Sequence, residues 1–296
     1  MTVPRDQELA SSSSSTRSRS SSDDGSLNFR SFTACVSRPE SAIGLRDSLQ
    51  RWPDAVTVYV NDNVRGVRDA RVIILGCKPR AYRVILGAPG MRDALKGKLL
   101  VSILGGVSVN EVEDALYAPH PLHSPDPHEG GRCTIIRAIP NIAALVGQST
   151  TIIPQSQSQD PSQTTGDAVR LVTAIFKCVG HVATVSTDLV DVATSIGASS
   201  LAFFATLLEA VAAGATPAGM PLSQAIEIAA YAMLGTAELV LSGEQPSTIR
   251  LKVATPGGST MTGLQVLQDR RVPTSITDAV EATVAAVGRL SARHEE

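Results

Sequence analysis

This sequence is poor in aromatic residues and in cysteine, and it has almost no net charge. Phenylalanine, tryptophan and tyrosine make up 3% of its 296 residues, while alanine, valine and leucine are plentiful, so we expect cores of closely packed aliphatic side chains. Its 26 lysines and arginines against 28 acidic residues leave a net charge of −2. A charge this close to neutral argues against nucleic acid or an anionic membrane as a partner.

The cysteines and histidines lack the spacing of a disulfide framework or a metal site. The four cysteines, Cys35, Cys77, Cys133 and Cys178, are scattered with no C-x-x-C pair, and three of the four lie in apolar runs. This pattern indicates a reducing compartment. Three histidines, His120, His123 and His128, share a proline- and glycine-rich loop. We interpret that loop as solvated and expect no bound metal.

No unbroken apolar stretch is long enough to span a bilayer, and the first thirty residues lack the apolar core of a secretory signal. Residues 10–26 are low-complexity and serine-rich, and such a segment cannot bury enough apolar surface to offset its ordering entropy. Residues 1–28 are therefore predicted to be disordered. We expect a cytoplasmic protein, although Arg17 and Arg19 in an acid-free stretch leave an organelle open.

Residues 29–160 alternate between strand and helix patterns. The predicted strands are Ser31–Ser37, Thr57–Val60, Ala70–Cys77, Leu99–Leu104 and Cys133–Ala138. The predicted helices are Pro39–Trp52, Met91–Lys96 and Val109–Tyr117. The run Ala70–Cys77 is typical of a strand buried on both faces. This alternation predicts an α/β, Rossmann-like parallel sheet.

Residues 161–296 read mainly as helices. They are predicted at Gly166–Val179, Asp188–Thr194, Ala202–Gly214, Ser223–Ser242 and Ile276–Ala292, with one short strand at His181–Val185. The middle helices are rich in alanine and apolar on more than one side, so part of their burial should come from a second subunit. The second part is predicted to be an all-α dimerisation domain.

A dinucleotide-binding domain normally opens with a strand, a G-x-G-x-x-G loop and a helix, and no such loop occurs before residue 100. The first visible strand ends in Ser37-Arg38, residues that suit the 2′-phosphate of NADP at the end of strand two. We therefore expect the chain to start inside the domain, with the sheet incomplete at its N-terminus. An exposed arginine after a strand remains an alternative interpretation.

Three further segments carry polar groups at strand or helix ends. Gly76-Cys77-Lys78-Pro79 and Arg137-Ala-Ile-Pro-Asn141 each end a predicted strand, where ligands bind in open parallel sheets. In Thr255-Pro-Gly-Gly-Ser-Thr260 a break precedes a helix that Ser259 and Thr260 are expected to cap, and a helix N-terminus attracts a carboxylate. Solvated loops and a plain capped turn are the competing interpretations.

Taken in order, these segments resemble the Δ1-pyrroline-5-carboxylate reductases, especially the fungal kind. The matching stretches include SFTACVSRPESA, ARVIILGCKPRAY, KLLVSILGGVSV, RAIPNIAALVG and KVATPGGSTMTGLQVL, and the resemblance covers roughly residues 29–292. It implies reduction of a cyclic imine acid with NADPH or NADH. It also implies homodimers, or higher oligomers, formed through the C-terminal helices.

The resemblance assigns roles to specific residues. On the cofactor side it implies Ser37, Arg38, Asn63, Gly76, Cys77, Lys78 and Pro79. Around the substrate it implies Asn141, Glu244, Thr255, Gly257, Gly258 and Thr260. Thr260 would hold the imine nitrogen or relay its proton, which makes it the implied catalytic residue.

Two departures affect the substrate pocket. The family's Ser-Gly-Ser-Gly-Pro-Ala is replaced by Ile196–Ala202 (IGASSLA), and Ile142 replaces the usual threonine after Asn141. A related imine, such as piperideine-carboxylate giving pipecolate in specialised metabolism, is therefore an alternative to pyrroline-5-carboxylate giving proline. A catalytically impaired relative acting as a dimerising or regulatory partner is the alternative from another functional class.

Overall fold

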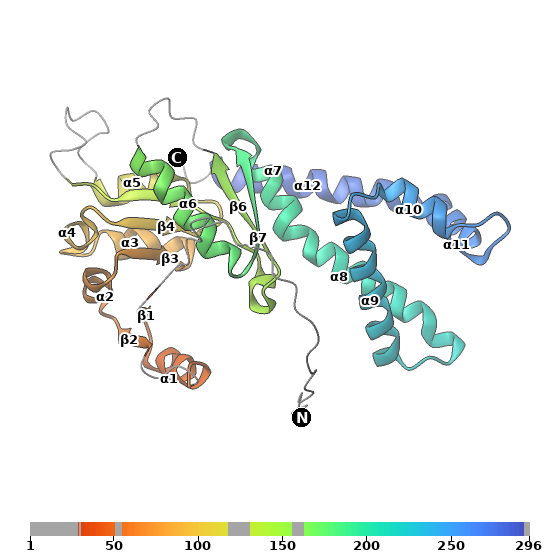
Figure 1. Ribbon diagram of the computed structural model, residues 1–296, viewed down its shortest axis with the longest axis horizontal. Coiled ribbons are helices and arrows are strands. Elements are labelled where there is room, and N and C mark those ends of the chain that lie inside the picture. The colour runs from red at the N-terminus through yellow and green to blue at the C-terminus, as the bar shows by residue number, and fades with distance from the viewer. Residues whose placement is uncertain (1–28, 30, 51–54, 118–130, 156–162, 293–296) are drawn as a thin grey trace, which may run out of the picture.

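The computed structural model describes residues 29, 31–50, 55–117, 131–155 and 163–292. A sheet-containing part is followed by a long helical arm that projects away from it (Figure 1). The predicted disordered segment 1–28 and the loop with His120, His123 and His128 lie outside the described residues. This architecture confirms the prediction of a Rossmann-like α/β part followed by a helical part.

The first two strands form a small parallel sheet of their own. Strand β1 (Phe32–Val36) pairs with β2 (Val56–Val60), and α1 (Pro39–Ser48) connects them. Helix α1 starts with proline at its first position, where the missing N–H costs nothing. Helix α2 (Asn63–Asp69) follows β2, and the side chain of Asp62 caps it by accepting a hydrogen bond from the Arg65 N–H.

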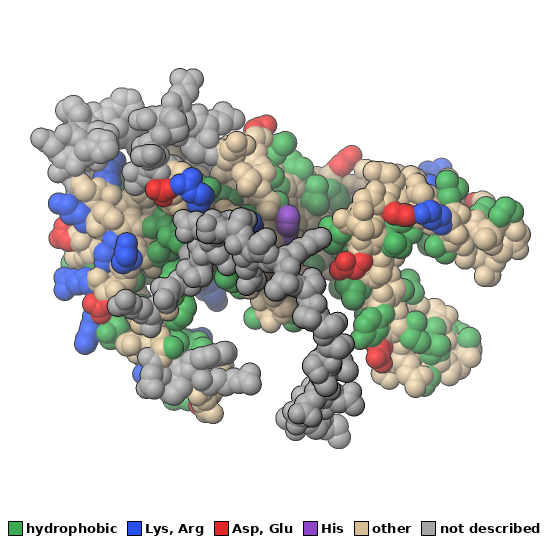
Figure 2. All heavy atoms as spheres, in the orientation of Figure 1, with side chains coloured by type: hydrophobic (Ala, Val, Ile, Leu, Met, Phe, Trp, Pro, Cys, Tyr) green, Lys and Arg blue, Asp and Glu red, His purple; other side chains and the backbone are tan. Residues whose placement is uncertain are grey.

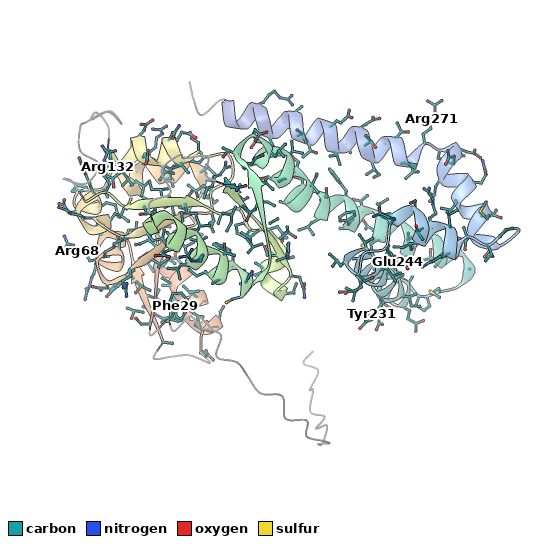
Figure 3. The ribbon with its side chains drawn as sticks, turned by 45° about the horizontal axis from the view of Figure 1, so that its top comes forward. Phe29, Arg68, Arg132, Tyr231, Glu244 and Arg271 are labelled. Carbon is teal, nitrogen blue, oxygen red and sulfur yellow. The ribbon has the colours of Figure 1, made fainter. Side chains whose placement is uncertain are left out.

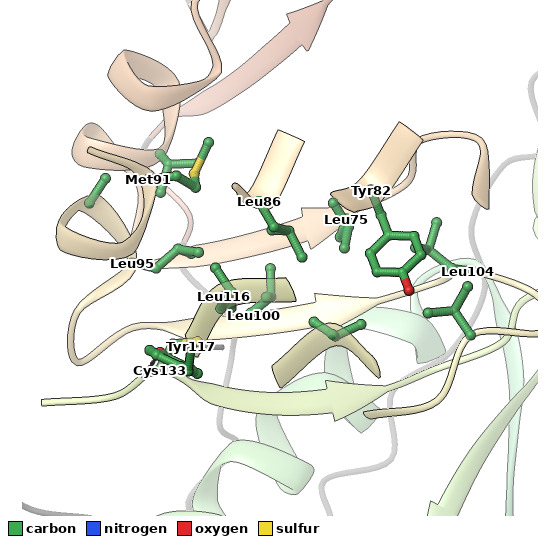
Figure 4. Close-up of a cluster of buried hydrophobic side chains, with 14 residues drawn as sticks. Leu75, Tyr82, Leu86, Met91, Leu95, Leu100, Leu104, Leu116, Tyr117 and Cys133 are labelled. Atoms are coloured by element: carbon green, nitrogen blue, oxygen red, sulfur yellow. Dashed lines mark hydrogen bonds between the residues drawn. The ribbon is translucent and has the colours of Figure 1, made fainter. Parts of the chain in front are cut away.

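Three more parallel strands form the second sheet, in the order β3 (Val72–Leu75), β4 (Leu99–Ser102) and β5 (Thr134–Arg137). The connections are η1 (Pro79–Ala81), α3 (Tyr82–Leu86), α4 (Met91–Leu95) and α5 (Val109–Tyr117). One apolar cluster fills the space between these helices and the strands, with Leu95 and Leu100 fully buried (Figure 4). This core fixes where β3, β4 and β5 end.

The two sheets do not join. In a doubly wound sheet of order 3-2-1-4-5-6, strands β2 and β1 would be the third and second, and β3, β4 and β5 the fourth to sixth. No described strand lies between β1 and β3, so the sheet is divided where strand one would run. Phe32 on β1 and Ile74 on β3 are 53% and 50% exposed. The prediction that β3 is buried on both faces is therefore wrong, because the strand lies at a sheet edge.

A third sheet leads towards the helical arm. Strand β6 (Ser149–Gln155) pairs in parallel with β7 (Gly180–Ser186), and α6 (Gln163–Lys177) connects them. Val172 and Phe176 of α6 share a core with Val101 and Ile136 of the second sheet. Strand β6 was not predicted, because its sequence STTIIPQ combines polar residues with an internal proline.

The arm begins with a continuous helical run through η3 (Thr187–Leu189), α7 (Val190–Thr194), a π-turn η4 (Ser195–Ser199) and α8 (Ser200–Ala215), and ends in η5 (Thr216–Ala218). The sequence had predicted two helices separated by a break. Helices α9 (Leu222–Leu241), α10 (Pro246–Val253), α11 (Ser259–Asp269) and α12 (Val272–Ala292) follow. Helix α9 packs on α8, and α12 returns to contact α7 and the π-turn.

The arm exposes large apolar side chains along α8, α9 and α10, including Val211, Tyr231, Leu241 and Leu251 (Figure 2). The helical runs Thr187–Ala218 and Leu222–Leu241 are long and apolar enough to cross a membrane by length and composition alone, and only 11% of an apolar 18-residue window in each is buried. The sequence had predicted no such run. A helix this apolar and this exposed needs a covering surface.

Candidate active site

The carboxyl ends of β3, β4 and β5 lie at one edge of their sheet, because the three strands are parallel and in register. Gly76–Pro79 follows β3, Gly105-Gly106 follows β4, and Arg137–Asn141 ends and follows β5. Open parallel sheets bind ligands in the crevice outside these ends. The fold therefore brings two of the predicted segments to the same edge.

The segment after β3 is tightly placed. A side chain at Gly76 would come within 3.2 Å of the Ile103 side chain, so glycine keeps the backbone close to the neighbouring strand end. Burial raises the pKa of the Cys77 thiol, which therefore stays protonated at neutral pH. Lys78 is exposed and precedes η1, so its ammonium group can reach a phosphate or a ribose.

Ser37, Arg38 and Asn63 gather at the ends of β1 and β2. The Asn61 N–H donates to the Val36 carbonyl at 2.9 Å, which places the two strand ends side by side. Ser37 and Arg38 are exposed, and the Arg38 side chain makes no capping bond to α1. A hydroxyl and a guanidinium so placed fit a phosphate group. These residues belong to the first sheet, across the gap from Gly76–Pro79.

A small cavity of about 130 Å³ lies beyond the ends of β4, β5 and β7, with Ser108, Glu111, Arg137 and Asp191 among its lining residues. Burial lowers the pKa of the Arg137 guanidinium, and the charges of Asp191 and Glu111 oppose that shift. Glu111 is 6% exposed and accepts hydrogen bonds from the backbone and hydroxyl of Ser108. This charged cluster joins the sheet to α7.

Asn141 stands at the junction of the sheet and the arm. Its Nδ2 donates to the Gly197 carbonyl at 2.7 Å, and its Oδ1 accepts from the Ala143 N–H at 2.9 Å. Its own N–H donates to the Ser149 hydroxyl at 3.0 Å. The amide has a second N–H, which can still face a ligand. The exposed Ile142 begins η2 (Ile142–Val146) directly after it.

The remaining predicted residues lie at the far end of the arm. Glu244 is far from Arg68 and Arg132 of the sheet part, and residues 255–260 span the turn after α10 and the start of α11 (Figures 1 and 3). Glu244 is half-buried and pairs with Lys252. One copy of the chain therefore does not bring Thr255, Gly257, Gly258 and Thr260 to the strand ends.

The glycine turn before α11 has the geometry of an anion-binding helix start. Gly257 has a φ of +75°, a conformation that favours glycine. Gly258, rather than Ser259, is the capping residue, and no side chain caps the helix. The prediction that Ser259 and Thr260 cap α11 is thus wrong, since both lie inside its first turn. The first amides of a helix lack intrahelical partners and suit an anion, and in α11 they lie beside the exposed Thr260.

Sequence reasoning missed part of this site. It gave Arg137 no role, and it did not identify Glu111, Asp191 or Gly197. The Ser108-x-x-Glu111 capping box was readable and places Glu111 at the start of α5. The partners across the cavity were not readable, because they come from a helix more than fifty residues later. In the described part of the chain, no group of His, Cys, Asp and Glu could hold a metal ion.

Comparison with known proteins identifies the family. A family described as "Pyrroline-5-carboxylate reductase dimerisation" matches residues 187–290. A pyrroline-5-carboxylate reductase of Lophium arboricola is 42% identical over 256 residues, covering 86% of this chain and 78% of that protein. A Δ1-pyrroline-5-carboxylate reductase of Curvularia clavata is 35% identical over 274 residues, covering 92% and 83%.

Solved structures agree on the fold. A pyrroline carboxylate reductase of Plasmodium falciparum, solved with NADP bound, superposes with a TM-score of 0.68 at 19% identity, covering 88% of this chain and 99% of that one. The enzyme of Coxiella burnetii gives a TM-score of 0.67 at 22% identity, covering 89% and 99%. These comparisons confirm the resemblance seen in the sequence: the chain belongs to the pyrroline-5-carboxylate reductase family.

Proposed function

We propose that this protein reduces a cyclic imine acid with NADPH or NADH, converting pyrroline-5-carboxylate to proline or a closely related imine to its saturated amino acid. The observation that carries the proposal is the identity of 42% to a named reductase over most of both chains. The placement of Gly76–Pro79 and Asn141 at one sheet edge supports it.

The residues divide the chemistry between them. The nicotinamide cofactor supplies a hydride, which adds to the imine carbon while a proton goes to the nitrogen. Ser37 and Arg38 would bind the 2′-phosphate of NADPH, with Asn63 beside the adenosine, whereas NADH has no such phosphate for them to bind. Gly76–Pro79 and Asn141 would border the nicotinamide and the substrate. The protein thus contributes orientation and charge placement.

We propose that a second copy of the chain completes the site. Thr255, Gly257, Gly258 and Thr260 lie far from Asn141 within one chain, and the exposed apolar arm coincides with the matched dimerisation family. A twofold dimer that interlocks the arms would deliver one copy's α11 to the other's strand ends. The amides of α11 would bind the substrate carboxylate, Glu244 would support the turn, and Thr260 would hold or protonate the imine nitrogen.

Binding and turnover test the proposed activity. NADPH is titrated calorimetrically into the full chain, and oxidation of NADPH is followed with pyrroline-5-carboxylate and with piperideine-carboxylate. Saturable binding with turnover of either imine supports the reductase. A folded dimer that binds no NADPH and turns over neither imine would refute it, and would favour a dimerising partner without catalysis.

Mixed dimers test the shared site. Thr260→Ala removes the hydroxyl from one half-site and Lys78→Ala removes the ammonium group from the other. If each site combines two chains, an equal mixture of the two weakly active variants regains about a quarter of the parental activity, because half of the dimers are mixed and each holds one intact site. If each chain holds its whole site, the mixture gains nothing over the average of its components.

The cytoplasm is the compartment that we propose. All four cysteines are free in the structure, and Cys133 is the only one that is buried. Sequence reasoning placed three of them in apolar runs, but Cys35 on β1 and Cys178 in the turn after α6 are exposed. Exposed thiols stay reduced in the cytosol.

A further inference from the structure

The helical run that leaves the sheet contains a π-turn, η4 (Ser195–Ser199), between α7 and α8. A π-turn widens the helix by one residue and is frequently found at functional sites. It also loosens the regular pairing of carbonyls along the helix. The hydrogen bonds that hold such a turn are therefore expected to come partly from neighbouring side chains.

Side chains hold this turn from two directions. On the buried side, the Ser195 hydroxyl donates to the Asp191 carbonyl at 2.8 Å and the Ser200 hydroxyl donates to the Ser195 carbonyl at 3.4 Å. From the sheet, Asn141 donates to the Gly197 carbonyl at 2.7 Å across 56 residues of sequence. Asn141 thus links the end of the sheet to this turn through its side-chain amide.

Asn141 is itself held rigidly. Its Oδ1 caps η2 through the Ala143 N–H, and its backbone is fixed by the buried Ser149 of β6. Because both ends of the side chain are occupied, a shift of Asn141 would move the π-turn with it. The bond to Gly197 connects two rigid elements.

Two exposed apolar side chains flank this bond. Ile142 follows Asn141 and is 74% exposed, while Ile196 precedes Gly197 and is 58% exposed. Because the Asn141 side chain is hydrogen-bonded to the Gly197 carbonyl, Ile142 and Ile196 are the sequence neighbours of the two bonded residues. The pair offers an apolar surface beside the carboxyl edge of the sheet. Burying one methylene against such a surface stabilises binding by about 0.8 kcal/mol, or roughly fourfold in affinity.

We infer that Asn141 is a positioning residue that holds the π-turn, so that Ile142 and Ile196 form an apolar wall that discriminates the ring size of the substrate. This inference rests on the proposed function, since it concerns the imine ring. The methylenes of the ring would contact the wall, while the carboxylate is bound elsewhere. A six-membered ring gains more from this wall than a five-membered one.

Asn141→Asp separates the two roles of the amide. The aspartate keeps an oxygen for the Ala143 N–H but presents an acceptor, without a donor, to the Gly197 carbonyl. Gly197→Ala is the matched control, because its new methyl group would meet Ile152 at an ordinary contact distance of 3.5 Å and leave the bond intact. Ile196→Ala shortens the wall at an exposed position, so it should fold normally.

The first measurement needs no substrate. Hydrogen exchange of the backbone amides of residues 195–200 is compared in the ligand-free parent, Asn141→Asp and Gly197→Ala. Faster exchange confined to Asn141→Asp supports the inference, because the bond then stabilises the turn itself. Equal exchange in all three proteins would overturn it, and this outcome does not depend on whether the protein is a reductase.

The second measurement is the ratio of kcat/KM for piperideine-carboxylate over pyrroline-5-carboxylate. Asn141→Asp and Ile196→Ala should each lower this ratio about fourfold, the value of one methylene contact, and Ile196→Ala should leave the affinity for NADPH unchanged. Gly197→Ala should leave it unchanged. An active parent whose ratio is unaffected by either variant refutes the wall, whereas a parent inactive on both imines refutes the proposed function.

Discussion

Gly180 offers the sharpest test of the junction between the sheet and the arm. It opens β7 directly opposite Ser149 of β6, with a φ of +146°. A methyl group there would lie 2.1 Å from the Ser149 carbonyl oxygen and 2.3 Å from its nitrogen. Both are backbone atoms of a buried strand, so they cannot move aside as a flexible side chain would. Gly180→Ala must therefore separate the two strands or distort their ends.

The cost follows from two contributions. A non-glycine residue in this backbone region costs about 1–3 kcal/mol, and the displaced strands lose backbone hydrogen bonds worth about 1 kcal/mol each. We expect Gly180→Ala to lower the free energy of unfolding by about 3 kcal/mol or more. Because Ser149 holds Asn141, the KM for the imine should also rise.

Urea denaturation followed by circular dichroism measures the effect. Gly44→Ala is the control, since Gly44 lies in the exposed middle of α1 with no atom near its missing methyl group. That change should be neutral or stabilise the protein by up to about 1 kcal/mol. If Gly180→Ala unfolds at the same urea concentration as the parent, the close pairing of β6 with β7 at Ser149 is wrong.

Three further outcomes are expected. Arg137→Met leaves Glu111 and Asp191 to repel each other across the cavity, so it should destabilise the protein by about 3 kcal/mol in thermal or urea unfolding, while Arg137→Lys should lose less. Arg38→Ala should raise the Kd for NADPH about tenfold and leave that for NADH nearly unchanged, and an equal loss for both cofactors would remove Arg38 from the 2′-phosphate site. Burial raises the pKa of Tyr117 to about 12 from 10.0, so folding stabilises the neutral phenol, and stability should fall as the pH rises from 10 towards 12. Tyr117→Phe should flatten this alkaline decline, measured as the unfolding midpoint against pH, and an unchanged slope would contradict the burial.

The sequence predicted most helices and strands of the sheet part because their patterns are strong and local. Leu99–Ser102, for example, is a fully buried apolar run, and α5 begins with its own capping box. Strand β6 was missed because its burial depends on β7 and α6, which no local pattern reveals. The edge position of β3 was missed for the same reason, since exposure of Ile74 depends on what pairs with the strand.

In the candidate site, the residues at strand ends were predictable, but the distances between them and the residues of the helical arm were not. Gly76–Pro79 and Asn141 follow apolar runs, and parallel strands end together by geometry. The position of Thr260 on α11, far along the arm, was not predictable, because the direction of each helix depends on packing. The π-turn was read as a break, since the residues Ser195–Ser199 resemble a loop in composition. The hydrogen bond between Asn141 and Gly197 joins residues 56 apart in sequence, so no local pattern could reveal it.

The π-turn is also the point at which helix α8 leaves the sheet part of the chain. Helix α8 has 16 residues after it, which at 1.5 Å each give an arm of about 24 Å. A bend of about 10° at the π-turn would displace the far end of α8 by about 4 Å. The hydrogen bond from Asn141 to the Gly197 carbonyl therefore affects the position of the helices that follow the π-turn. The geometry at the base of the arm therefore determines where α8 and α9 present their exposed apolar side chains.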